Sequence, residues 1–67
     1  MDIGKNIKRI REKYDIEQQE LAGRVGISPA MMSYIEKGDK IPSVAVLKNI
    51  AKALHCTLDE LVSEQSA

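Results

Sequence analysis

Aromatic residues are scarce in this sequence: among 67 residues there is no tryptophan, no phenylalanine and only two tyrosines. Aliphatic side chains must therefore form any hydrophobic core, and an apolar fraction of 43% favours a folded domain over a disordered chain. Proline and glycine are also few, and no stretch alternates apolar and polar residues as a half-buried strand does. These absences predict an all-α fold with one domain at most.

Cysteine is nearly absent as well. The single Cys56 excludes an intrachain disulfide and suits a reducing compartment. His55 beside it raises the possibility of a nucleophile or a zinc site, but two residues are too few ligands, so a helix-ending histidine and a small buried thiol are favoured. No signal peptide is recognisable, and no apolar run approaches the roughly 20 residues that span a bilayer. We expect a cytoplasmic protein with no metal, cofactor, membrane or small-molecule partner.

The chain has no net charge, with ten basic and ten acidic residues, which argues mildly against a generic polyanion binder. The distribution is uneven, because residues 1–14 carry a charge of +3 whereas residues 53–67 hold three acids and no lysine or arginine. The basic residues within 1–14 are equally consistent with an ordinary solvated helix face and with a surface that faces phosphate groups. The sequence contains no glycine-rich phosphate loop and no nucleophile–base set, so we do not expect an enzyme.

Helical periodicity predicts five helices, at about 2–14, 18–25, 29–37, 44–54 and 58–63. Their expected inner residues are, in chain order, Ile3, Ile7, Ile10 and Tyr14; Leu21, Ala22 and Val25; Met31, Met32 and Ile35; Val44, Leu47, Ile50, Ala51 and Leu54; and Leu58, Leu61 and Val62. We expect one domain over 1–63 and a flexible tail over 64–67.

Capping residues delimit the third helix sharply. Gly26 and Gly38 suit the left-handed backbone that ends a helix. Ser28 is an N-cap residue, and Pro29 falls at the first helical position, where its missing N–H costs nothing. Ser43 and Thr57 are expected to cap the two later helices in the same way.

The outer side of the third helix predicts a function. With Ile35 turned inward, a helical wheel places Pro29, Ala30, Ser33, Tyr34 and Lys37 on the opposite side. This face carries no acid, and a helix of this size fits a major groove about 12 Å wide. The small Ala22 and the turn at Gly26 complete the pattern of a helix-turn-helix over about 18–37.

The stretch QQELAGRVGISPAMMSYIEKG resembles the helix-turn-helix of Cro/CI-type (XRE-family) transcriptional regulators. The segments IGKNIKRIREKYDIEQQELA and IPSVAVLKNIAKALHCTLDELV extend the resemblance over nearly the whole chain. It implies a compact five-helix, lambda-repressor-like domain that binds double-stranded DNA sequence-specifically, usually as a dimer on a palindrome. The simplest regulator of this kind is a repressor, although some small relatives activate.

The resemblance also implies site residues. The positions expected near backbone phosphates are Gln18, with Gln19 beside it, Ser28, Lys37, Lys40 and Ser43. The base-facing positions are Pro29, Ala30, Ser33 and Tyr34. Arg11 and Glu36 are expected to form a structural ion pair between the first and third helices. Pro29 and Ala30 have no side-chain donor, so they are limited to contacts with thymine methyl groups or to shape readout.

A homodimer surface is expected near the end of the chain, formed by Val46, Ala53, Leu58, Leu61 and Val62. The alternative is that these residues only complete the small core. The neutral charge and the few donors at Pro29 and Ala30 keep a second function open, in which the same scaffold is a protein-interaction module or an antitoxin-like partner.

Overall fold

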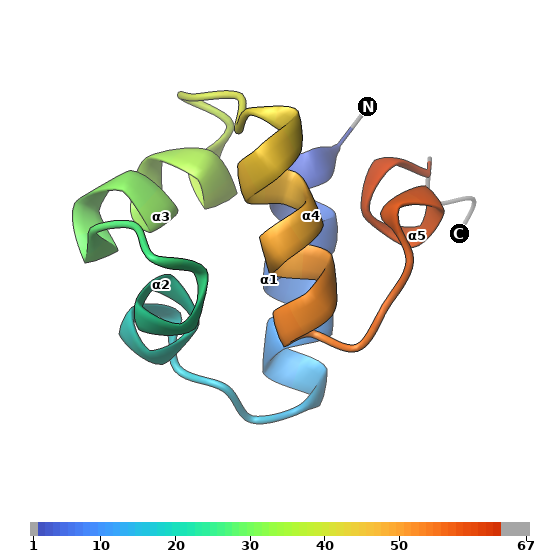
Figure 1. Ribbon diagram of the computed structural model, residues 1–67, viewed down its shortest axis with the longest axis horizontal. Coiled ribbons are helices and arrows are strands. Elements are labelled where there is room, and N and C mark those ends of the chain that lie inside the picture. Colours follow the sequence, from blue (N-terminus) through green and yellow to red (C-terminus); the bar gives the residue numbers. More distant parts are fainter. Residues whose placement is uncertain (1, 64–67) are drawn as a thin grey trace.

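The computed structural model describes residues 2–63, so the predicted tail, 64–67, lies outside the described residues. The described chain forms five α-helices and no strand, which confirms the all-α prediction: α1 (Ile3–Lys13), α2 (Gln18–Val25), α3 (Pro29–Lys37), α4 (Val44–Ala53) and α5 (Leu58–Val62). The predicted boundaries are right to within one residue. In Figure 1, α2 and α3 lie on one side of α1 and α4, and α5 lies on the other.

The predicted caps are present. The hydroxyl oxygens of Ser28, Ser43 and Thr57 accept hydrogen bonds from backbone N–H groups in the first turns of α3, α4 and α5. Gly26 and Gly38 both have φ of 88°, the left-handed conformation that ends α2 and α3. These local signals fix where α2 ends and where α3 begins and ends.

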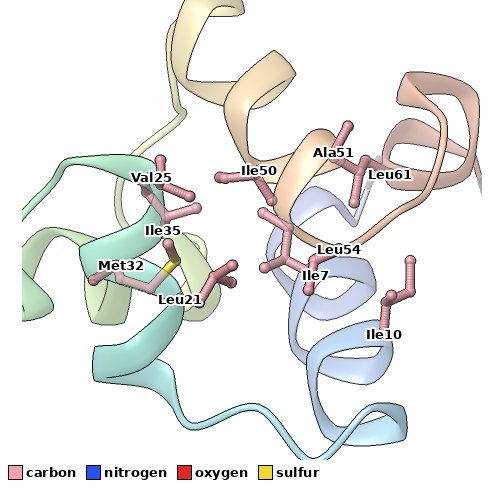
Figure 2. Close-up of a cluster of buried hydrophobic side chains, with 11 residues drawn as sticks. Ile7, Ile10, Leu21, Val25, Met32, Ile35, Ile50, Ala51, Leu54 and Leu61 are labelled. Carbon is pink, nitrogen blue, oxygen red and sulfur yellow. The ribbon is translucent and has the colours of Figure 1, made fainter.

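The core is aliphatic, as the composition requires. Figure 2 shows side chains from α2 and α3 meeting those from α1 and α4, with Met32 directed toward Leu21. The buried apolar residues are Ile7, Ile10, Leu21, Ala22, Val25, Met32, Ile35, Ile50, Ala51, Leu54 and Leu61. The inner faces of all five helices therefore share one cluster.

Three residues expected inside are exposed, and each lies at a helix end. Tyr14 is the C-cap residue of α1, where its ring lies 5.6 Å from Lys13 Nζ instead of entering the core. Met31 is in the first turn of α3 and is 36% exposed, and Val44 is the first residue of α4. The helical period continues to these positions, but none of the three belongs to the buried cluster.

Cys56 is half-buried against the core, not fully buried as expected. Burial raises the pKa of its thiol, and the nearby Glu60 carboxylate adds to the effect. None of the helices within residues 2–63 is both long and apolar enough to cross a membrane.

Candidate nucleic-acid interface

The inner side of α3 is fixed by a buried ion pair. Arg11 Nε donates to Glu36 Oε2 at 2.7 Å and Arg11 Nη2 donates to Glu36 Oε1 at 3.0 Å, so the pair is bidentate. The two side chains are only 11% and 4% exposed. The hydrogen bond to Glu36 raises the pKa of Arg11, against the opposing effect of burial. The ion pair that the resemblance implied thus joins α1 to α3.

The same carboxylate holds α2. Gln18 Nε2 donates to Glu36 Oε1 at 3.0 Å, and Arg11 Nη1 donates to the carbonyl oxygen of Ile16 at 2.8 Å. The resemblance had implied a DNA phosphate as the partner of Gln18. Its amide NH2 has two hydrogens, so the bond to Glu36 does not by itself prevent a second donation. One buried acid therefore sets the position of α3 relative to both preceding helices.

Two further residues at helix crossings were not expected from the sequence. A Cβ atom on Gly4 would lie 2.4 Å from the carbonyl oxygen of Ile35, so α1 crosses α3 at a distance that only glycine permits. Asn6 is buried, and its Nδ2 donates to the carbonyl oxygens of Leu61 and Ser63, both at 2.8 Å. The available signal for Asn6 was its place on the apolar stripe of α1, three residues after Ile3.

The outer side of α3 is accessible. Pro29, Ala30 and Tyr34 are exposed, and Ser33 is half-buried between them. The face is apolar in its first turn and gains hydroxyl groups in the next. Met32 and Ile35 occupy the opposite, buried side as the wheel predicted, but Glu36 is buried with them and Met31 is exposed.

The residues expected near phosphates border this face or lie beside it. Gln19, Ser28, Lys37, Lys40 and Ser43 are exposed. The hydroxyl oxygens of Ser28 and Ser43 accept hydrogen bonds from backbone N–H groups, so the hydroxyl hydrogen of each serine is available to donate a further bond. Lys37 and Lys40 also line, with Lys5, a groove of 280 Å³ between the start of α1 and the end of α3. The structure thus brings cations to the C-terminal end of α3.

The expected dimer surface needs one correction. Leu61 is fully buried in the core, so its side chain is not available to a second copy. Its side chain packs in the apolar cluster, while Asn6 donates to its carbonyl oxygen and so links α1 to α5. The other four expected residues, Val46, Ala53, Leu58 and Val62, are half-buried.

Comparison with known proteins decides the family. A family model described as helix-turn-helix matches residues 7–61, which include all of α2, α3 and α4. The chain belongs to this helix-turn-helix family. Its members are DNA-binding transcriptional regulators of the XRE type, among them repressors, and not enzymes.

Individual relatives agree with the assignment. The chain is 33% identical over 58 residues to the uncharacterized HTH-type transcriptional regulator YazB of Bacillus subtilis, covering 87% of this chain and 84% of YazB. It superimposes with a TM-score of 0.88 on the P22 c2 repressor solved in complex with a synthetic operator, at 31% identity over 97% of this chain and 98% of that one. The match to the biofilm regulator SinR in complex with DNA has a TM-score of 0.85, 27% identity, and coverage of 91% and 98%.

Proposed function

We propose that the chain is a sequence-specific regulator that binds a palindromic DNA duplex as a homodimer, with α3 of each copy in the major groove. The observation that supports this proposal most is the difference between the two sides of α3. Its inner side is anchored by Glu36 to α1 and α2, while its outer side is exposed and free of acids. A helix held in this way can enter a groove without deforming, so the binding energy is not spent on ordering it.

The base-facing residues in this proposal are Pro29, Ala30, Ser33 and Tyr34. Only Ser33 and Tyr34 have side chains that hydrogen-bond to base edges, and the Tyr34 hydroxyl cannot make a bidentate pair. Sequence readout by hydrogen bonds is therefore sparse, and apolar contact and DNA shape contribute the rest.

Phosphate contacts would position the helix. Lys37 and Lys40 supply charge at the C-terminal end of α3, and Gln18, Gln19, Ser28 and Ser43 supply hydrogen-bond donors near the starts of α2, α3 and α4. Because only two lysines are among these proposed phosphate contacts and the chain has no net charge, the salt dependence of binding is expected to be moderate per dimer. Bound across a promoter, such a dimer would most simply repress transcription by occlusion.

The dimer contact would use the half-buried residues Val46 and Ala53 of α4 and Leu58 and Val62 of α5. A single unit of this size contacts few base pairs, and two copies related by a two-fold axis match the symmetry of a palindrome. Sedimentation of the protein with and without its duplex tests this directly: two copies per duplex are expected, and one copy would contradict the dimer.

The proposed function is tested by selecting bound duplexes from a random DNA pool and then measuring affinity for the selected duplex and for a scrambled one at fixed salt. A palindromic product and at least a thousandfold preference are expected, in line with typical ratios of about 10³–10⁷. No enrichment by folded protein would contradict the proposal.

A second function is favoured by one observation. Ile41, in the loop between α3 and α4, is 86% exposed, and the neighbouring Val44 is also exposed. Exposed apolar side chains of this kind suit a protein partner, so the same scaffold could act as an interaction module. Replacing Ser33 and Tyr34 with Ala distinguishes the two functions: loss of DNA binding with folding intact supports the regulator, whereas unchanged DNA binding would count against it.

A further inference from the structure

The first turn of α3 has an unusual outer surface for a groove-binding helix. Pro29, Ala30 and Met31 are consecutive and all exposed, and none has a side-chain hydrogen-bond donor. Polar outward side chains begin only at Ser33. In helix-turn-helix proteins the second helix of the motif, here α3, approaches the base edges with its N-terminal residues. Here they can recognise a base only by apolar contact, and the apolar group in the major groove is the C5-methyl of thymine.

Met31 is the residue of this turn with the reach for such a contact. The adjacent methionines have separate places, because Met32 is fully buried in the core whereas Met31 is 36% exposed. The core therefore does not account for Met31. Its long thioether side chain adapts to an irregular apolar surface, and side chains in a helix lean toward the N-terminus, which is the end that approaches the bases.

The backbone under Met31 is well fixed. Its N–H donates to Ser28 Oγ at 3.0 Å, which closes the first turn of the helix. Tyr34 follows three residues later on the same flank and is 45% exposed. This flank of α3 thus presents a flexible apolar side chain next to a phenol with one hydrogen bond to give.

We infer that Met31 reads a thymine methyl group, so that duplexes bound by this protein carry thymine at the base step facing the first turn of α3. This inference rests on the proposed function. It adds a specificity-determining residue outside the base-facing set and a chemical requirement on the bound DNA, namely a methyl group that cytosine and purines lack at that place in the groove.

Uracil substitution tests the inference, because uracil differs from thymine only by the missing methyl group. In the selected duplex, each thymine is replaced in turn by uracil, and the Kd is measured for the wild type and for Met31→Ala. One position per half-site is expected to weaken wild-type binding about fourfold, the effect of losing one buried methyl group. In Met31→Ala that position should show no effect of uracil, while the effects at other thymines persist.

Two variants serve as controls. Met31→Leu keeps an apolar side chain of similar size and should retain the uracil effect. Ile41→Ala removes an exposed apolar side chain outside α3 and should leave every uracil effect unchanged. Met31→Ala should fold like the wild type, because an exposed alanine suits a helix.

The result that overturns the inference is a specific duplex whose uracil effects are the same in the wild type and in Met31→Ala. Failure to select any duplex would overturn both the inference and the proposed function, and it would appear at the selection, before any uracil is introduced.

Discussion

The two sides of α3 differ in how completely they are constrained. On the inner side, Glu36 accepts three hydrogen bonds from Arg11 and Gln18, and Gly4 lets α1 approach the backbone of α3. On the outer side, the first turn is held by the hydroxyl of Ser28 and is otherwise exposed. The inner side thus determines where the helix lies, and the outer side is free to determine what it binds.

This contrast predicts that variants on the two sides separate stability from DNA binding. The largest loss of stability is expected for Glu36→Ala, which leaves the Arg11 guanidinium buried without its partner and removes the acceptor of Gln18. Breaking a buried pair in this way costs about 3–5 kcal/mol in the free energy of unfolding, enough to unfold much of a domain this small. Urea denaturation measures the loss.

An exposed ion pair gives the matched control for that variant. Glu20 accepts a hydrogen bond from Arg24 at 2.6 Å on the surface of α2, and Glu20→Ala should change the free energy of unfolding by about 0.5 kcal/mol or less. Equal losses for Glu36→Ala and Glu20→Ala would show that the buried pair does not fix α3.

Gly4→Ala should give the next largest loss. Its Cβ would meet the carbonyl oxygens of Ile35 and Glu36 at 2.4 and 2.6 Å, so α1 and α3 must separate, at a cost of about 1–3 kcal/mol. Gly23 in α2 is the control, because a Cβ there meets nothing within 4 Å. Gly23→Ala should stabilise the helix by about 0.5–1 kcal/mol. Thermal unfolding distinguishes the two, and a stable Gly4→Ala would contradict the close crossing.

A smaller loss of stability than for Glu36→Ala or Gly4→Ala is expected on the outer side. Ser28→Ala removes the acceptor of the Met31 N–H and should cost about 1 kcal/mol. Because the cap also orders the first turn, the variant should lose affinity for the selected duplex more than Ser43→Ala, which removes the equivalent cap of α4. Equal losses of affinity would indicate that the first turn of α3 has no special place in binding.

Much of the fold was predictable because its signals are local. The helix period, the caps at Ser28, Ser43 and Thr57, and the glycines that end α2 and α3 are properties of short stretches of chain. Asp15 and His55 have φ of 56° and 54°, so they take the left-handed conformation without glycine where α1 and α4 end.

The contacts between segments that are distant in the sequence were harder to predict. The role of Gly4 depends on the distance between α1 and α3, and that of Asn6 depends on where α5 ends, neither of which periodicity contains. The exposure of Met31 and Val44 likewise depends on which helix surfaces pack together, which the helical period does not show. The pairing of Arg11 with Glu36 was expected only through the resemblance to the family.

The most direct test of the account compares the two tyrosines. Tyr34 lies on the outer side of α3 and Tyr14 at the end of α1, with similar exposures of 45% and 51%. Affinity for the selected duplex, measured at one salt concentration, should fall about tenfold or more in Tyr34→Ala, in line with about 1–3 kcal/mol for a base contact. It should stay within about twofold in Tyr14→Ala, and both variants should unfold like the wild type, since exposed substitutions typically cost about 0.5 kcal/mol or less. Equal affinities for the two variants would contradict the claim that the outer side of α3 binds DNA.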